Sequence, residues 1–181
     1  MTEWIISSNP KVFRTDDALR DLGKIEWHQT NNIKNLQIGD IVYIYISSPI
    51  REIHWKCKVN DVNRMYSLID DTKYYQYDVS GQVFHGPFAE IEVVAEYTMP
   101  ELLSYENLKK NGLNNKLMGP CKVKSALASY IADVDKLEND PVRKGAYLNT
   151  ISSGKLKKLA IKHSGKNRQI KNTIKTAIYY R

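Results

Sequence analysis

The fold of this chain is decided by the stretch Ile38-Gly39-Asp40-Ile41-Val42-Tyr43-Ile44-Tyr45-Ile46-Ser47-Ser48. A Gly-Asp turn leads into a run whose apolar side chains fill both alternating sets, with Ile41, Tyr43 and Tyr45 on one side and Val42, Ile44 and Ile46 on the other. A strand that is apolar on both faces is covered on both faces. We therefore expect a central strand of a sheet or closed barrel, whose last residues lie at the mouth of the next loop.

Shorter strands are expected before and after this segment, where β-branched and aromatic residues cluster or alternate with polar ones. They cover residues 3–7, 25–29, 51–59, 65–71 and 88–97. The alternation in 51–59 is clean, and it places Ile53, Trp55, Cys57 and Val59 in the core and His54 in solvent.

Helices are expected near the start of the chain and after the strands. Thr15 is a suitable N-cap and Gly23 a suitable end for the first helix. After Pro100 the apolar spacing becomes helical, which predicts helices near 102–112 and 123–134. Five or six short strands with one early helix and later helices predict an α+β fold, a small mixed β-barrel with flanking helices over residues 1–135.

The composition indicates an ordinary globular protein without secretion or membrane signals. No signal-peptide pattern is present, and no window approaches the length of a membrane span. Cys57 and Cys121 have no CxxC partner and no histidine at metal spacing, which favours two reduced thiols. We therefore expect a cytoplasmic protein with no membrane partner, no metal and no cofactor.

Positive charge is concentrated at the end of the chain. The segment from Val142 to Arg181 holds eleven Lys and Arg residues and no Asp or Glu, so the preceding residues carry −4 of the total of +7. This asymmetry predicts a basic extension over residues 142–181, helical in its spacing, that contacts a polyanion such as nucleic acid. The alternative is a tail that only keeps the chain soluble. The predicted phosphate contacts are Lys155, Lys157, Lys158, Lys162, Lys166, Arg168, Lys171 and Lys175.

Motifs of known catalytic centres are missing from the sequence. It contains no Gly-rich phosphate loop, no GxSxG and no HExxH. Asp70 and Asp71 are adjacent at the end of an expected strand, where such residues usually form turns. We expect no enzymatic activity. The alternative is a small nuclease subunit that uses Asp70, Asp71 or His85.

A candidate pocket surrounds Trp27. This residue is followed by His28-Gln29-Thr30-Asn31-Asn32, a run of short polar side chains. An aromatic ring beside amide and hydroxyl groups suits a flat, partly polar ligand, because the ring stacks while the polar groups bind the ligand's edge. The alternative is that Trp27 fills the core and 30–32 is a plain turn.

The order of these features resembles the EVE domain, a PUA-like barrel related to YTH and ASCH domains. The resemblance rests on Ser7-Ser8-Asn9-Pro10 after a Trp-containing strand, Trp27 with Thr30 and Asn32, and the strand that follows Gly39-Asp40. It covers roughly Trp4 to Ile131 and is closest to the EVE modules at the front of prokaryotic restriction-type proteins. Many EVE domains have Lys-Ser-Glu-Pro where this chain has Ser7-Ser8-Asn9-Pro10.

The resemblance implies a reader of modified bases, in which a methylated nucleotide is flipped out of its strand into an aromatic pocket. Trp27 matches the pocket-wall tryptophan, and Ile50 is the bulky apolar residue in the loop that supplies the second wall in YTH domains. The polar residues that match the pocket lining are Ser7, Ser8, Asn9, Thr30, Asn32, Tyr45, Ser47 and Ser48.

Three hypotheses remain open. The first is a non-catalytic module that binds methylated DNA or RNA, acting with a separate nuclease or NTPase subunit, because the restriction-type relatives carry such domains in the same chain. The second is a PUA-like RNA-binding protein without preference for modified bases. The third is the small nuclease subunit.

Overall fold

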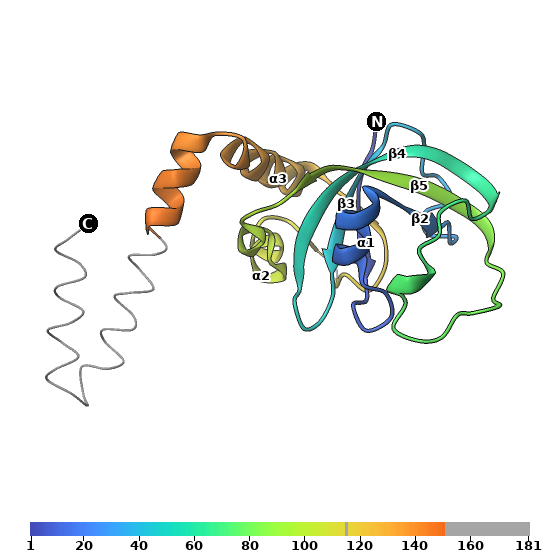
Figure 1. Cartoon of the computed structure of the whole chain (residues 1–181). Coiled ribbons are helices and arrows are strands. Elements are labelled where there is room, and N and C mark those ends of the chain that lie inside the picture. Colours follow the sequence, from blue (N-terminus) through green and yellow to red (C-terminus); the bar gives the residue numbers. More distant parts are fainter. Residues whose placement is uncertain (115, 151–181) are drawn as a thin grey trace, which may run out of the picture. The chain divides into compact units, whose positions relative to one another are not determined.

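The computed structural model describes residues 1–114 and 116–150 (Figure 1). The strands are β1 (Glu3–Ser8), β2 (Lys24–His28), β3 (Ile41–Ile46), β4 (Glu52–Tyr66), β5 (His85–Glu96) and β6 (Cys121–Lys122). The α-helices are α1 (Thr15–Leu22), α2 (Tyr105–Lys110) and α3 (Ser125–Glu138), with 3-10 turns at Thr72–Tyr74 and Pro100–Leu103. Residues 141–150 are also helical. The predicted helical extension continues beyond them, outside the described residues.

The strands form one mixed sheet in the order β2-β5-β4-β3-β1-β6, in which β1 and β3 are parallel and the other neighbours antiparallel. The expected α+β class is confirmed. The sheet does not close into the expected barrel, because β2 and β6 remain as its edges among the described residues. β6 pairs only two residues with β1, whereas the long strands β4 and β5 curve through several register shifts (Figure 1). Residues 67–71 form no strand, so the separate strand expected at 65–71 is wrong.

β3 separates two apolar cores, as its sequence predicts. Val42, Ile44 and Ile46 belong to a core that also contains α1 residues, Trp4 and Trp55. Tyr43 and Tyr45 belong to a second core on the opposite face, with residues of α2 and α3. The strand lies between β4 and β1 in the sheet, so both of its edges are also paired.

A bulge in β4 decides which side chains reach α1. Ile44 pairs with Trp55 but Tyr45 pairs with Ile53, so His54 is an extra residue at this point. His54 Nδ1 lies 3.0 Å from a carboxylate oxygen of Asp16, and Trp55 Nε1 donates to the same carboxylate at 2.7 Å. The His54 side chain is only 15% exposed, so its expected position in solvent is wrong.

The turn before β3 is held by a buried carboxylate. Gly39 has a φ of +90°, which its missing side chain permits. Asp40 is buried, and its carboxylate accepts hydrogen bonds from Thr2 N at 2.6 Å, Trp4 Nε1 at 3.1 Å and Gln37 N at 3.1 Å. These bonds tie the start of β3 to β1, which positions the parallel pair.

The chain divides into two units, Met1–Asp135 and Lys136–Arg181, and the site described below lies in the first. In the second unit, Lys144 Nζ pairs with Glu138 at 2.8 Å. No helix of the described part of the chain combines the length and apolarity needed to cross a membrane.

Candidate binding pocket

A cavity of about 240 Å³ opens beside the end of β1, the strand β2 and the loop between β4 and β5. This volume is close to the lower end of small-ligand sites, roughly 300–1,000 Å³. We call it the Trp27 pocket. Its lining residues are Ser7, Ser8, Asn9, Val12, Phe13, Ile25, Glu26, Trp27, His28, Asp71 and Tyr75.

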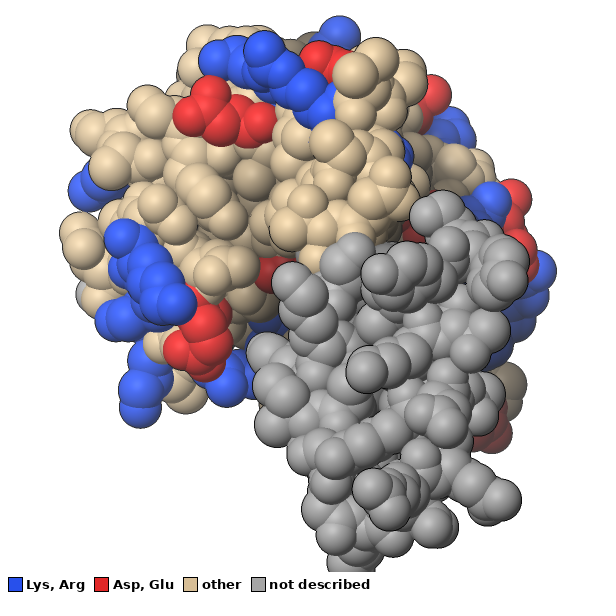
Figure 2. All heavy atoms as spheres, turned by 90° about the vertical axis from the view of Figure 1, so that its left-hand side faces the viewer, with Lys and Arg blue, Asp and Glu red and all other residues tan. Residues whose placement is uncertain are grey.

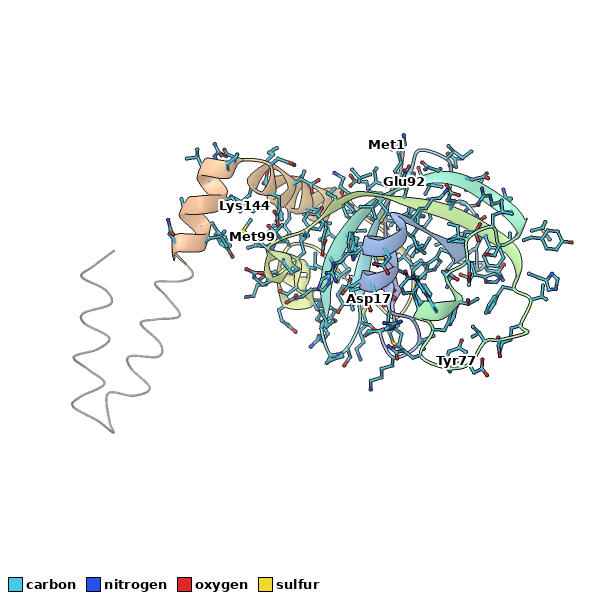
Figure 3. All side chains as sticks on the ribbon, in the orientation of Figure 1. Met1, Asp17, Tyr77, Glu92, Met99 and Lys144 are labelled. Carbon is cyan, nitrogen blue, oxygen red and sulfur yellow. The ribbon has the colours of Figure 1, made fainter. Side chains whose placement is uncertain are left out.

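The walls of the Trp27 pocket are aromatic. Phe13 and Tyr75 form a backbone bridge, and their rings meet edge to face at 4.9 Å. Tyr75 also stacks on Phe84 at 5.5 Å and contacts the ring of Tyr77 at 5.6 Å. Tyr77 lies on the outer side of this loop (Figure 3). The loop between β4 and β5 is therefore attached to the pocket by a row of rings, and Trp27 supplies another wall from β2.

Small polar groups line the side formed by β1. Ser8 is buried, and its hydroxyl is hydrogen-bonded to that of Thr15 at the start of α1. Asn9 Oδ1 accepts a hydrogen bond from Lys11 N at 3.0 Å, while the Asn9 carbonyl accepts from Val12 N and Phe13 N. These bonds shape the turn after β1 so that Phe13 reaches the pocket.

Two carboxylates line the pocket, and one of them is already paired. The Glu26 side chain is 2% exposed and accepts hydrogen bonds from Arg64 Nη1 at 2.8 Å and from Leu68 N at 3.0 Å. For the Asp71 carboxylate, the structure shows no hydrogen bond or ion pair with any other described residue. Burial raises the pKa of Asp71 to about 6, and the nearby charge of Glu26 adds to the rise. The pocket can thus accept hydrogen bonds from N–H groups of a flat ligand.

The structure brings together only part of the predicted pocket. Ser7, Ser8, Asn9 and Trp27 line one cavity. Thr30 and Asn32 are exposed in the turn after β2 and line none of the described cavities. Ile50 is 40% exposed and likewise supplies no wall.

Residues at the end of β3 line a different cavity. It has a volume of about 390 Å³, and we call it the Arg51 cavity. Its lining residues are Tyr45, Ser47, Ser48, Arg51, Tyr105, Lys116 and Leu117. Alternation along β3 explains the separation, since Tyr45 faces the second core whereas Trp27 packs against the first. Tyr45, Ser47 and Ser48 therefore do not face Trp27 as expected.

The pocket contains residues that the sequence patterns do not single out as ligand contacts. Phe13, Glu26 and Tyr75 come from three separate segments, and Asp71 fits a turn equally well. The feature of the sequence that points to this loop is the tyrosine-rich run from Tyr74 to Tyr77. No group of three or more His, Cys, Asp or Glu side chains among the described residues could hold a metal ion.

The predicted phosphate contacts of the basic extension lie outside the described residues. On the face drawn in Figure 2, Lys and Arg side chains lie in small groups close to Asp and Glu side chains, separated by uncharged residues. The visible part of the described surface is thus mixed in charge, and its positive charge forms small patches and no continuous basic face.

Comparison with family models gives no match, and comparison with curated proteins gives none. Solved structures do match. A hypothetical protein from Leishmania major has 16% identity and a TM-score of 0.52, over 77% of this chain and 98% of its own. A protein from Pseudomonas syringae has 20% identity and a TM-score of 0.52, over 73% of this chain and 98% of its own.

An ASCH protein from Zymomonas mobilis is also similar, with 10% identity and a TM-score of 0.47, over 73% of this chain and 94% of its own. This likeness is too distant to bear on function. At these identities the first two structures show a shared fold and nothing further.

Proposed function

We propose that this chain is a nucleic-acid-binding module that holds one flipped-out base in the Trp27 pocket. The observation that carries the proposal is a small cavity with aromatic walls and carboxylate acceptors. The rings of Trp27, Phe13 and Tyr75 supply stacking surface, which every base can use. The resemblance to EVE domains supports the same ligand class and adds the preference for a methylated base.

The carboxylates of the pocket restrict which base edge fits. Glu26 is buried and already accepts from Arg64 and Leu68, so the free acceptor is Asp71. Ionised Asp71 can only accept hydrogen bonds, so it favours edges that present N–H groups. Adenine, cytosine and guanine carry such groups, whereas the edge of thymine or uracil has a single N–H between two acceptors. A methyl group on the bound base would be buried against the aromatic walls at little cost.

The proposal includes binding without cleavage, with Lys155, Lys157, Lys158, Lys162, Lys166, Arg168, Lys171 and Lys175 as phosphate contacts. A separate nuclease or NTPase subunit as partner remains a prediction from the resemblance. Binding to the tail should be steep in salt and nearly independent of sequence.

The test is a binding screen of duplex DNA, single-stranded DNA and RNA that contain methylated adenine, methylated cytosine or plain bases, at two salt concentrations. Trp27→Ala should weaken binding of the preferred methylated strand about fivefold or more, because one stacked base contributes roughly 1–3 kcal/mol. Tyr66→Ala is the control, since Tyr66 is an exposed aromatic residue that does not line the pocket. Equal affinity of the wild type for methylated and plain strands would refute modified-base recognition. A preference for RNA regardless of methylation would favour the PUA-like RNA-binding alternative.

Asp71 favours one second candidate, an acid–base reaction on the bound nucleotide. A carboxyl with a raised pKa beside another carboxylate in a cavity is typical of catalytic sites. Cleavage or deamination by the wild type that is lost in Asp71→Asn, while binding of the strand is retained, would support this candidate over binding alone.

A further inference from the structure

We propose that the Arg51 cavity binds a phosphate group of the nucleic-acid backbone, next to the base held in the Trp27 pocket. That the phosphate belongs to a nucleic-acid backbone rests on the proposed function. That the cavity binds phosphate rests on its own residues. It lies at the end of β3, on the face of the sheet opposite to the Trp27 pocket.

Arg51 is held in place by its backbone. Its φ is +65°, a left-handed conformation that non-glycine residues seldom adopt. Its N–H donates to the Ile46 carbonyl at 2.9 Å, and its carbonyl accepts from Tyr105 N at 2.8 Å. The residue therefore links the loop after β3 to the start of α2.

The guanidinium group of Arg51 is also oriented. Its carbon lies 4.4 Å from the centre of the Tyr105 ring. Its positive charge also opposes the rise that burial causes in the pKa of the Tyr45 hydroxyl, so the two groups are close together. The guanidinium is planar, and packing on a ring fixes the orientation of that plane, so its remaining N–H groups point in set directions that suit the oxygens of a phosphate. Less side-chain freedom is then lost when the anion binds.

The rest of the cavity fits the same ligand. Lys116 adds a second positive charge, and the hydroxyls of Ser47 and Ser48 can donate to phosphate oxygens. One acid competes, because Glu106 Oε1 lies 3.2 Å from Arg51 Nη2. Both side chains are well exposed, 47% for Arg51 and 67% for Glu106, so this ion pair is weak and can be displaced.

A backbone hydrogen bond at the ends of the parallel strands links a lining residue of each cavity. Ser8 lines the Trp27 pocket and Ser47 lines the Arg51 cavity, and Ser47 N donates to the Ser8 carbonyl at 2.8 Å. A strand of nucleic acid that crosses this edge would meet aromatic and acidic groups on one face and basic groups on the other. The base and its phosphate would thus be held by different sides of the sheet.

The experiment measures binding of a single-stranded oligonucleotide at several salt concentrations. Arg51→Gln and Lys116→Gln should each weaken binding, the former roughly tenfold, and each should lower the slope of log K against log salt by about 1. The affinity ratio of methylated to plain strands should stay unchanged, since neither residue lines the Trp27 pocket. Glu106→Gln should strengthen binding about twofold, because it removes the competing acid.

Arg20→Gln is the matched control. The Arg20 side chain is 50% exposed, pairs with Glu96 at 2.6 Å and lies over the Trp55 ring at 5.6 Å, so it resembles Arg51 but lines neither cavity. Equal weakening by Arg20→Gln and Arg51→Gln would overturn the proposal, because the effect would then reflect net charge alone.

Inorganic phosphate separates this proposal from the proposed function. Millimolar phosphate should shift the amide NMR signals of Ser47, Ser48 and Arg51 in the wild type but not in Arg51→Gln, even if no oligonucleotide binds. Absence of these shifts together with unchanged oligonucleotide binding by Arg51→Gln refutes the site. Shifts with phosphate but unchanged oligonucleotide affinity overturn the assignment to the backbone and indicate a free phosphate ligand.

Discussion

Ionised Asp71 should make the folded protein less stable, and Asp71→Asn should remove that cost. Burial, together with the charge of Glu26, raises the pKa of Asp71 from 3.8 to about 6. The folded state therefore holds this proton more tightly than the unfolded state does. The resulting stabilisation is fully present below pH 3.8 and is lost as the pH rises through 6. At neutral pH the wild type carries the cost of a partly buried carboxylate without a described partner.

The expected size follows from the shift. A rise from 3.8 to about 6 corresponds to about 3 kcal/mol, at 1.36 kcal/mol for each pKa unit. Asp71 is only partly buried, so solvent screening reduces the effect, and we expect about 1–2 kcal/mol. Asn has nearly the same shape as Asp, so the substitution should add little packing change of its own.

The measurement is urea denaturation of wild type and Asp71→Asn at pH 4 and pH 7.5. The free energy of unfolding of the variant, measured relative to that of the wild type, should rise by about 1–2 kcal/mol from pH 4 to pH 7.5. Asp70→Asn is the control, because Asp70 is exposed and hydrogen bonds from Thr72 lower the pKa of its carboxyl, so no such gain is expected there. A difference between Asp71→Asn and wild type that is the same at both pH values would refute the assigned environment. A gain in stability that is accompanied by weaker ligand binding would show that the carboxylate serves the site at the expense of the fold.

Three further substitutions test the frame around the site. Asp40→Ala should cost about 1–3 kcal/mol in urea denaturation, since it leaves the buried Trp4 Nε1 and the part-buried N–H groups of Thr2 and Gln37 without their acceptor, whereas Asp40→Asn should cost less; a loss below 1 kcal/mol would contradict the assigned bonds. Gly86→Ala should destabilise by more than about 2 kcal/mol, because its Cβ would lie 1.9 Å from the Arg64 carbonyl oxygen, and an unchanged midpoint would disprove this close approach. Burial opposes protonation of His54, but the hydrogen bond and charge of Asp16 outweigh it and raise the pKa of His54. The stability from this pair should be complete below pH 6.5 and decline above it, and His54→Gln should remove that pH dependence in thermal denaturation.

The features best predicted from the sequence are those that depend on the alternation of apolar and polar side chains along a single strand. β3 shows apolar residues in both alternating sets, and each set lies in a core of its own. The bulge at His54 has no such signal, because one extra residue in β4 reverses the expected direction of its side chain without changing the composition. Closure of the sheet into a barrel also could not be predicted from local sequence patterns. It depends on whether the edge strands β2 and β6, which are distant in the sequence, pair with each other.

The pocket was predicted in part for the same reason. Ser7 to Asn9 and Trp27 come together because the end of β1 and the strand β2 are both near α1, which the order of elements indicates. The sequence does not show which face of the sheet carries Trp27. Tyr45 and Ser47 are therefore predicted on the same face as Trp27, whereas the structure places them at a cavity on the opposite face. Asp71 reaches the pocket through a loop more than forty residues after Trp27, and such distant contacts leave no periodic signal.

The parallel pairing of β1 with β3 explains why two cavities of opposite charge lie at one edge. Both strands end at the same side of the sheet, and each then turns toward a different face: β1 leads into α1, and the loop after β3 leads to Arg51. The ionised Asp71 carboxylate in the Trp27 pocket repels phosphate. The Arg51 cavity offers a bound base only the rings of Tyr45 and Tyr105, and the guanidinium already covers the ring of Tyr105. On both proposals together, charge helps to orient a nucleic-acid strand, with a base toward Asp71 and a phosphate toward Arg51. Reversing the charge of either cavity should then weaken binding by misorienting the ligand, even where the stacking surface is intact.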